Sequence, residues 1–293
     1  MRSFLFVPGD SPRKFERGSQ GPADALILDL EDSVSPDRKA EGRSLTREML
    51  NADRRQQKVF VRVNALETGL TLEDLAAVMS GRPNGIVLPK CSSADQVRQL
   101  SLYLDAFETA SGLGVGSTRI VAIATETAES LFGLSGYRDC SPRLWGLMWG
   151  GEDLSASIGA TENRRNGVYH SPYRLARDLC LMAASAAGVA AIDTVYTDID
   201  DLAGLEEEAR FARRDGFSAK AVIHPKHVEA VNAAFTPSAE EVAWAERIVA
   251  AFALDPGMGV VKLDGKMVDK PHLRVAEKIM AVARTGAPPD DLA

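Results

Sequence analysis

The sequence is poor in cysteine. Cys91, Cys140 and Cys180 are its three cysteines, and they lie far apart with no CxxC spacing. Disulfide frameworks and zinc sites need cysteines in pairs, so we interpret these three as buried or indifferent thiols in a reducing compartment. The pattern argues against a secreted protein stapled by disulfides.

Long apolar runs are missing as well. The N-terminus, Met1 to Gly9, contains a short apolar run that Pro8 and Gly9 interrupt, and it is shorter than the apolar core of a signal peptide. No stretch approaches the roughly 20 apolar residues that a membrane helix needs. We therefore expect a cytoplasmic protein that does not act at a membrane.

Positive charge is not in excess. The net charge is −7, with 34 Lys and Arg against 41 Asp and Glu, and the acidic residues are spread along the chain. This balance argues against nucleic acid as a partner. It leaves room for a small anionic ligand, which needs only a local cluster of Arg or Lys.

The sequence does contain a regular alternation of short apolar runs and amphipathic helical stretches. The eight candidate strands are residues 3–7, 25–30, 59–63, 85–88, 120–125, 144–149, 192–196 and 219–223. The main helical stretches between them are residues 36–50, 72–80, 93–110, 172–187, 201–214 and 227–234. Apolar strands that alternate with helices predict parallel pairing with both faces covered. Eight such units favour a closed (β/α)8 barrel, and no GxGxxG follows the first strand to indicate a dinucleotide-binding sheet.

Turn and capping residues support these helices. Ser35-Pro36 and Ser171-Pro172 each place a hydroxyl before a proline, which predicts two helix starts, and Gly188 predicts a helix end. We expect the barrel to occupy residues 1–236 and a C-terminal extension to occupy residues 237–293. In the extension we expect a helix over 239–253, a hairpin over 257–265, a loop over 266–272 and a helix over 273–284. The extension is interpreted as a lid, an arm onto a neighbouring subunit, or decoration.

Polar side chains gather where the strands end, and the carboxyl ends of the strands form the active site of this barrel type. The residues at these ends are Asp29, Glu31, Asp32, Arg62, Asn64, Lys90, Glu126, Glu152, Asp153, Asp198 and His224. Exposure of strand ends to solvent explains one or two of these charges. It does not explain charges directly after five apolar runs, so we favour an active site.

Glu126 and Asp153 are the most informative pair. Each follows an apolar strand, and adjacent strands would bring both carboxylates to one place. Two like charges held together are unfavourable unless a proton or a cation joins them. Oxygen ligands indicate Mg²⁺ or Mn²⁺ rather than zinc. The alternative is a pair of salt-bridged acids at the end of the barrel.

Other residues add to this site. Gly150 and Gly151 expose backbone N–H groups that suit a carboxylate, and Arg62 suits bidentate contact with a carboxylate or a carbonyl oxygen. Arg13 and Arg17 lie four residues apart on one helical face, which fits phosphate binding as well as a solvated surface. Taken alone, His224 is typical of a structural histidine and Asp269 of a loop aspartate.

Eight motifs, in one order along the chain, carry a resemblance to a known family. They are 2–9 (RSFLFVPG), 28–32 (LDLED), 61–64 (VRVN), 88–90 (LPK), 126–128 (ETA), 151–154 (GEDL), 223–225 (IHP) and 265–269 (GKMVD). Together they resemble the citrate lyase β-subunit-like proteins of the HpcH/HpaI aldolase group, which includes enzymes of the malyl-CoA and citramalyl-CoA lyase type. Small departures, such as Ala219 before Lys220 and His227, remove no chemical group.

The resemblance implies a Mg²⁺-dependent lyase that cleaves 3-hydroxyacyl thioesters. It implies that Glu126 and Asp153 bind the metal and that Arg62 polarises the substrate carbonyl. It also implies that Asp269 acts as a general acid or base in a neighbouring subunit's site, in a trimer or a dimer of trimers. The expected contacts of substrate and coenzyme A are Pro8, Gly9, Arg13, Arg17, Arg62, Glu126, Gly151, Ile223 and His224. The residues expected to support them from behind are Asp29, Glu31, Asp32 and Lys90.

The sequence therefore predicts an acyl-CoA lyase. The expected reaction is retro-Claisen cleavage of malyl-, methylmalyl- or citramalyl-CoA to acetyl- or propionyl-CoA and a 2-keto acid, with thioesterase activity as a possible addition. One alternative is a citrate lyase β subunit that acts on a citryl-acyl-carrier-protein thioester in a complex. A scaffold without catalytic activity is the third hypothesis.

Overall fold

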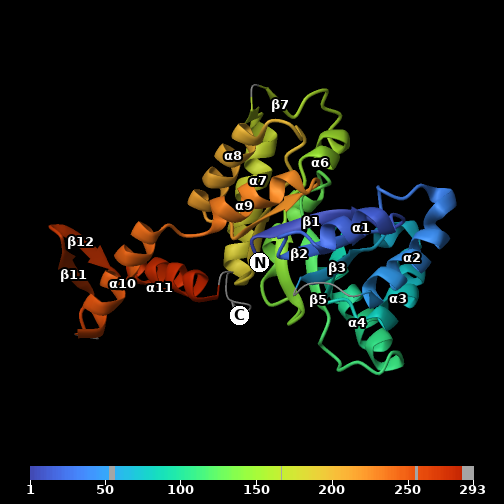
Figure 1. The fold of residues 1–293 in the computed structure, drawn as a ribbon, viewed down its shortest axis with the longest axis horizontal. Helices are drawn as coiled ribbons and strands as arrows, with labels where there is room; N and C mark the ends of the chain where they lie inside the picture. Colours follow the sequence, from blue (N-terminus) through green and yellow to red (C-terminus); the bar gives the residue numbers. More distant parts are fainter. Residues whose placement is uncertain (53–56, 166, 255–256, 286–293) are drawn as a thin grey trace.

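A closed barrel of eight parallel strands forms the body of the molecule (Figure 1). The computed structural model describes residues 1–52, 57–165, 167–254 and 257–285. The strands are β1 (Ser3–Pro8), β2 (Ala25–Asp29), β3 (Lys58–Arg62), β4 (Gly85–Leu88), β5 (Arg119–Ile123), β6 (Leu144–Met148), β9 (Ala190–Asp193) and β10 (Ala219–Val222). They pair in the order β1-β10-β9-β6-β5-β4-β3-β2. The predicted (β/α)8 barrel is confirmed.

Helices cover the outside of the barrel. The long ones are α1 (Pro12–Ser19), α2 (Lys39–Asn51), α3 (Thr71–Val78), α4 (Ala94–Ala110), α7 (Ser171–Ala187), α8 (Leu202–Asp215) and α9 (Lys226–Phe235). The short ones are η1 (Pro36–Arg38), η2 (Leu66–Thr68), η3 (Met79–Gly81), α5 (Ser130–Gly133), η4 (Leu134–Tyr137) and α6 (Glu152–Ser157). A small hairpin of β7 (Arg164–Arg165) and β8 (Val168–Tyr169) lies between α6 and α7. The short elements α5, α6 and this hairpin were not predicted, because too few residues form them to show a period.

The strands are mostly apolar because they bury both faces; the buried Lys220 in β10 is an exception. In β2, Ala25 and Ile27 belong to the cluster inside the barrel, whereas Leu26 and Leu28 belong to the layer between barrel and helices. Phe4, Phe60 and Trp145 pack together inside the barrel, with ring centroids 5.5 to 6.3 Å apart. The interior is therefore a packed core and not a pore, and the ligand site of such a barrel lies at the carboxyl ends of the strands.

The seventh barrel strand lies earlier than predicted. The predicted strand was 192–196, but β9 is Ala190–Asp193. The apolar run includes both the predicted and the observed strand. The observed strand buries the charged Asp193, which is favourable because Asp193 pairs with Lys220. Asp198 is therefore not at a strand end, and the prediction that placed it there was wrong.

The capping predictions were partly wrong. Neither Ser35 nor Ser171 makes a capping hydrogen bond, and α7 begins at Ser171 itself, after His170. Proline at the first turn supplies the fixed backbone angle that starts these helices without a hydroxyl cap. Gly188 does end α7 in the left-handed conformation, with φ 69°.

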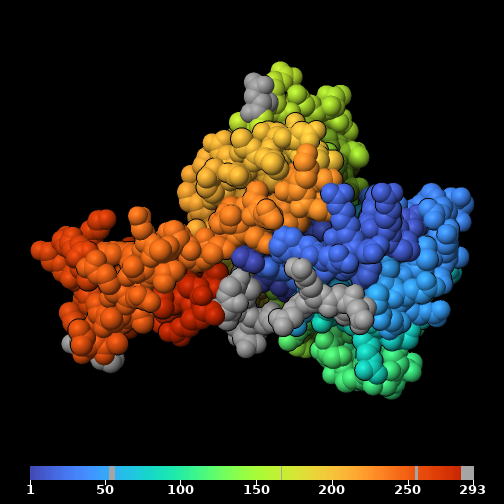
Figure 2. Space-filling view, viewed as in Figure 1, coloured from blue at the N-terminus to red at the C-terminus, as the bar shows by residue number. Residues whose placement is uncertain are grey.

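The C-terminal extension packs around a small core of its own. It consists of α10 (Ala239–Leu254), β11 (Val260–Leu263), β12 (Lys266–Asp269) and α11 (Lys270–Thr285). Its core residues are Ala245, Ile248, Phe252, Val261, Val268 and Ala276. Figures 1 and 2 show it as a lobe that projects to one side of the barrel. Residues 286–293 of the expected extension lie outside the described residues.

The hairpin of the extension is longer than predicted. Its turn is at Asp264 and Gly265, both with left-handed φ angles (49° and 76°), so the second strand uses residues 266–269 that were predicted to be a loop. The last helix then begins at Lys270 rather than at residue 273. Among the described residues, no helix combines the length and the apolar character needed to cross a membrane.

Candidate active site

A cavity of about 650 Å³ opens at the carboxyl end of the barrel. Its walls come from the ends of the strands and the loops that follow them. The polar and glycine residues that line it are Lys14, Arg17, Asp29, Asp32, Ser33, Arg62, Glu126, Gly150, Gly151, Glu152, Asp153, Thr194 and His224. Most of the strand-end residues singled out in the sequence therefore face one space.

Arg62, at the end of β3, is held in one orientation by two acids. Its Nε and Nη2 donate to the two carboxylate oxygens of Asp29 at 2.7 and 2.8 Å, and Nη1 lies 2.8 Å from Oε2 of Glu31. Its guanidinium also stacks over Phe6, 5.0 Å from the ring centroid. Burial disfavours the charged form, but these carboxylates keep the pKa of Arg62 above its usual range. The cavity thus contains a permanent, rigidly placed positive charge.

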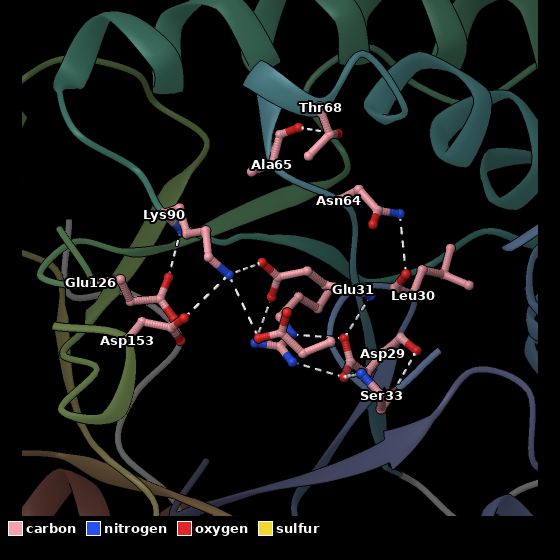
Figure 3. Close-up of polar contacts among 12 residues, drawn as sticks. Asp29, Leu30, Glu31, Ser33, Asn64, Ala65, Thr68, Lys90, Glu126 and Asp153 are labelled. Atoms are coloured by element: carbon pink, nitrogen blue, oxygen red, sulfur yellow. Dashed lines mark hydrogen bonds and ion pairs between the residues drawn. The ribbon is translucent and has the colours of Figure 1, made fainter. Parts of the chain in front are cut away.

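Glu126 is a buried carboxylate three residues beyond β5, and it is 4% exposed. Its Oε2 accepts the backbone N–H of Lys90 at 2.5 Å (Figure 3). Burial raises its pKa to about 8, and the nearby negative charges of Asp153 and Glu31 add to the rise. Such a group is unfavourable as a bare anion at neutral pH, so the position suits a bound cation.

Asp153 lies in the first turn of α6, two residues after the pair Gly150-Gly151. Its Oδ1 is 3.4 Å from Nζ of Lys90, the residue whose backbone N–H donates to Glu126 (Figure 3). The structure therefore brings Glu126 and Asp153 together, as the sequence predicted. Among the described residues, no group of three or more His, Cys, Asp or Glu side chains forms a metal cluster. Two carboxylates with open positions match what Mg²⁺ takes from proteins, whereas a structural zinc site needs more ligands.

A cationic rim borders the cavity where α1 approaches the end of β10. Lys14 and Arg17 reach it from α1, and His224 reaches it from the loop after β10. Burial lowers the pKa of His224, and the neighbouring His227, Lys226 and Arg17 lower it further. Nδ1 of His224 accepts the backbone N–H of Lys226 at 3.2 Å, so the proton of the neutral ring is on Nε2.

Some predicted contacts lie elsewhere. Arg13 is exposed on α1 and does not line the cavity, whereas Lys14, one residue on, does. The orientation of α1 determines which of its side chains reach the cavity. The i, i+4 spacing of the two arginines does not contain that orientation. Gly9 lies behind the wall, where its N–H donates to the carbonyl oxygen of Asp29 at 2.8 Å. Pro8 and Ile223 do line the cavity.

Five more polar residues from the sequence lie outside the cavity lining of their own chain. Glu31 and Lys90 stand behind it, in contact with Arg62 and Glu126. Asn64 is buried and donates from Nδ2 to the carboxylate of Asp74 at 2.7 Å, a structural contact. Asp198 is exposed in a loop. Asp269 ends β12 in the projecting extension and is bonded through Oδ1 to Nδ1 of His272 at 2.5 Å. Figure 1 shows β12 far from the barrel.

A second buried polar network, not predicted, supports the cavity from behind. Lys220 is fully buried and donates from Nζ to Asp193 (2.8 Å), to Glu208 (2.6 Å) and to the carbonyl oxygen of Thr194 (2.7 Å). The indole N–H of Trp149 donates to Asp193 at 2.6 Å. A lysine in the middle of an apolar strand was the signal that could have revealed this network.

Comparisons with known proteins agree with this geometry. The family model described as HpcH/HpaI aldolase/citrate lyase matches residues 2–225. A citrate lyase subunit beta-like protein of Mycobacterium tuberculosis is 36% identical over 279 residues, covering 94% of this chain and 93% of that protein. A (3S)-malyl-CoA thioesterase of Cereibacter sphaeroides is 35% identical over 295 residues, covering 96% of this chain and 94% of that protein.

A solved structure extends the likeness to three dimensions. The protein CitE of Mycobacterium tuberculosis, in complex with magnesium, acetoacetate and coenzyme A, superposes with a TM-score of 0.77 at 35% identity. The match covers 97% of this chain and 98% of that one. The likeness therefore includes the C-terminal extension as well as the barrel.

Proposed function

This chain belongs to the HpcH/HpaI aldolase/citrate lyase family, and we propose that it is a Mg²⁺-dependent carbon–carbon lyase acting on a 3-hydroxyacyl-CoA thioester. The proposed substrate is malyl-, methylmalyl- or citramalyl-CoA, cleaved to acetyl- or propionyl-CoA and a 2-keto acid. The observation that supports this best is the meeting of Glu126, Asp153 and Arg62 in one cavity. The complex of the related CitE with magnesium, acetoacetate and coenzyme A supports the same ligand set.

Glu126 and Asp153 are the proposed metal ligands. Both are oxygen donors, and the burial of Glu126 leaves it in need of a positive partner. Mg²⁺ fits this pair, and Mn²⁺ would fit the same ligands. When bound, the metal supplies a Lewis acid for the oxygens of the keto acid.

Arg62 is the proposed electrostatic partner of the thioester. The contacts with Asp29 and Glu31 fix its plane and leave a further N–H on each terminal nitrogen for a ligand. In retro-Claisen cleavage the hydroxyl loses its proton, the bond between C2 and C3 breaks, and the thioester half leaves as an enolate. The negative charge of the enolate develops on the carbonyl oxygen of the thioester. A permanently charged guanidinium beside that oxygen stabilises it. Protonation of the enolate carbon then completes the reaction.

Asp269 is the proposed acid or base for these proton transfers, and it acts in a neighbouring subunit. In its own chain it lies on the projecting extension, away from the barrel (Figure 1). A second copy of the chain would bring it to the cavity of another subunit. We therefore propose a homo-oligomer, a trimer or a dimer of trimers, in which each extension serves another subunit.

Coenzyme A is the proposed carrier of the acyl group. Lys14, Arg17 and His224 form a positive or hydrogen-bonding rim that suits phosphate groups. The likeness to a (3S)-malyl-CoA thioesterase supports this choice, and it supports thioester hydrolysis as a side activity. A citrate lyase β subunit acting on a citryl-acyl-carrier-protein thioester is the second candidate, favoured by the likeness to the citrate lyase subunit beta-like protein.

One assay separates these functions. The purified chain with Mg²⁺ would be incubated with malyl-, methylmalyl-, citramalyl- and citryl-CoA, and with citryl-acyl-carrier protein, and keto-acid release followed. We expect turnover of one of the first three, dependent on Mg²⁺ and lost in Glu126→Gln and Asp153→Asn, which keep the fold. Turnover of only the carrier-protein thioester would favour the citrate lyase subunit. Absence of both turnover and Mg²⁺ binding would favour the hypothesis of a scaffold without catalytic activity.

A further inference from the structure

Lys90 has an unusual backbone conformation at the metal site. It follows β4 with a φ of 50°, in the left-handed region that residues with a β-carbon seldom adopt without a compensating contact. Among the described residues, the other non-glycine residues with positive φ are Arg82, Asp139 and Asp264. Of these four, Lys90 is the residue that hydrogen-bonds to a proposed metal ligand, from a position behind the cavity lining. The conformation of Lys90 therefore calls for an explanation from its contacts.

This conformation lets one residue contact carboxylates on three loops. Its backbone N–H donates to Glu126 at 2.5 Å. Its Nζ pairs with Glu31 and lies 3.4 Å from Oδ1 of Asp153 (Figure 3). The same Nζ lies 3.6 Å from Oδ2 of Asp32. Burial disfavours its charge, but these acids raise the pKa of Lys90, which keeps it an ammonium ion. The two proposed metal ligands are thus joined by a single lysine.

Lys90 and Arg62 share a group of acids. Asp29, Asp32, Glu126 and Asp153 line the cavity, and Glu31 contacts both cations from behind the lining. Arg62 is committed to Asp29 and Glu31. In the part of the chain that the structure describes, Lys90 is the cation that pairs with Asp153. Its ammonium group therefore already supplies Asp153 with the positive partner that a bound metal ion would supply.

We propose that Lys90 is a positioning residue and an internal counter-ion of the metal site. Its backbone fixes Glu126, and its ammonium holds Asp153 nearby when no metal is bound and competes with Mg²⁺ for that carboxylate. The proposal rests on the proposed function, since it takes Glu126 and Asp153 as the metal ligands. Two cations beside one carboxylate repel each other, so Lys90 keeps the empty site assembled and the metal weakly held.

Substitution of Lys90 by Met tests this directly. Methionine keeps an unbranched chain and a β-carbon, so the backbone strain is unchanged and only the ammonium is lost. Mg²⁺ binding would be measured by calorimetry on the full chain. We expect the Mg²⁺ dissociation constant of Lys90→Met to fall about tenfold, the size expected for removing one charge roughly 5 Å from a divalent cation in a water-like dielectric. Lys90→Arg, which keeps the charge, should stay within about twofold of wild type.

A lysine elsewhere at the same end of the barrel provides the matched control. Lys226 pairs with Asp200, and neither residue lines the cavity. Lys226→Met should leave Mg²⁺ affinity unchanged. An equal gain in Lys226→Met would mean that general charge, rather than the contact with Asp153, causes the effect, and it would overturn the proposal.

A metal-free measurement makes the result independent of catalysis. In EDTA, Lys90→Met should lower the melting temperature, and the loss should be smaller in an Asp153→Asn background because the partner is already neutral. Additive effects of the two substitutions would overturn the proposal. If wild type binds Mg²⁺ but Lys90→Met binds it equally or more weakly, Lys90 is not a competitor while the proposed function stands. If neither protein binds Mg²⁺, both proposals fail.

Discussion

Gly150 lies against Glu126 so closely that a β-carbon at position 150 would stand 2.7 Å from Cγ of the glutamate. Real β-carbons essentially never approach a neighbour so closely, so the side chain of Glu126 depends on a glycine on the next strand's loop. Asp153 lies three residues later, in the first turn of α6. The glycine therefore couples the positions of the two proposed metal ligands.

Gly150→Ala tests this coupling. The methyl group would overlap Cγ of Glu126, so the glutamate side chain would have to shift away from the backbone N–H of Lys90. We expect the Mg²⁺ dissociation constant to rise at least about tenfold, about 1.4 kcal/mol, with a similar loss in kcat/KM. Calorimetry would measure the Mg²⁺ dissociation constant, and the rate of keto-acid release would give kcat/KM. Gly114→Ala is the control, since a β-carbon there meets no atom within 4 Å; equal behaviour of the two variants would contradict the prediction.

The raised pKa of Glu126 predicts how stability depends on pH when metal is absent. Its pKa of about 8 in the folded chain exceeds the ordinary value of 4.5, so between these values the folded state holds a proton that the unfolded state has lost. The free energy of unfolding should therefore decrease as pH rises from about 5 to 8, by up to about 1.4 kcal/mol per pH unit. Urea titrations in EDTA would measure it.

Two comparisons isolate the group responsible for that slope. Mg²⁺ should reduce it, because the cation replaces the proton on the carboxylate. Glu126→Gln should flatten it in EDTA, since glutamine does not titrate in this range. A slope that survives in Glu126→Gln would assign the effect to another residue.

Arg62→Lys tests the shape of the cation rather than its charge. Lysine keeps a positive charge but cannot donate two parallel hydrogen bonds to Asp29 or present fixed N–H groups to the substrate. We expect kcat to fall about 10²- to 10³-fold, the usual effect of losing one oriented donor in the transition state, with a smaller change in KM. Steady-state kinetics would show this. A variant with near wild-type kcat would mean that charge alone is enough at this position.

Asp269→Asn tests whether one subunit completes another's site. We expect loss of turnover with thioester binding retained, because the group acts on protons and does not hold the ligand. Coexpression of Asp269→Asn with Glu126→Gln, each inactive alone, should then restore activity. In a closed ring of randomly mixed subunits about a quarter of the sites have both groups intact. If mixing restores nothing, Asp269 does not act across subunits.

The barrel and the place of its acids could be predicted from the sequence for a simple reason. A barrel strand buried on both faces has to be apolar, so the first charge after each strand marks its end. Glu126 and Asp153 follow two such strands and do meet in the cavity. Their role as metal ligands stays a prediction, as does the role of Asp269 in another subunit.

Other features depend on details that a pattern of apolar and polar residues does not contain. The left-handed backbone of Lys90 sends its N–H and its ammonium to different carboxylates, and no local signal such as glycine announces it. The predicted bounds of β9 were wrong because the burial of Asp193 depends on its contacts with Lys220 and Trp149, which are distant in sequence. Contacts between distant segments decided both cases.

The buried contacts of Lys220 and Asp193 also bear on how the substrate range of this cavity can change. Asp193 accepts the indole of Trp149, and Lys220 donates to the carbonyl of Thr194, and both Trp149 and Thr194 line the cavity. The cavity walls that follow β6 and β9 are thus both hydrogen-bonded to the buried pair Lys220 and Asp193, so we expect their positions to be coupled. A new substrate shape that requires one wall to shift would displace the other. Selection in the laboratory should therefore find paired changes on both walls more readily than single ones.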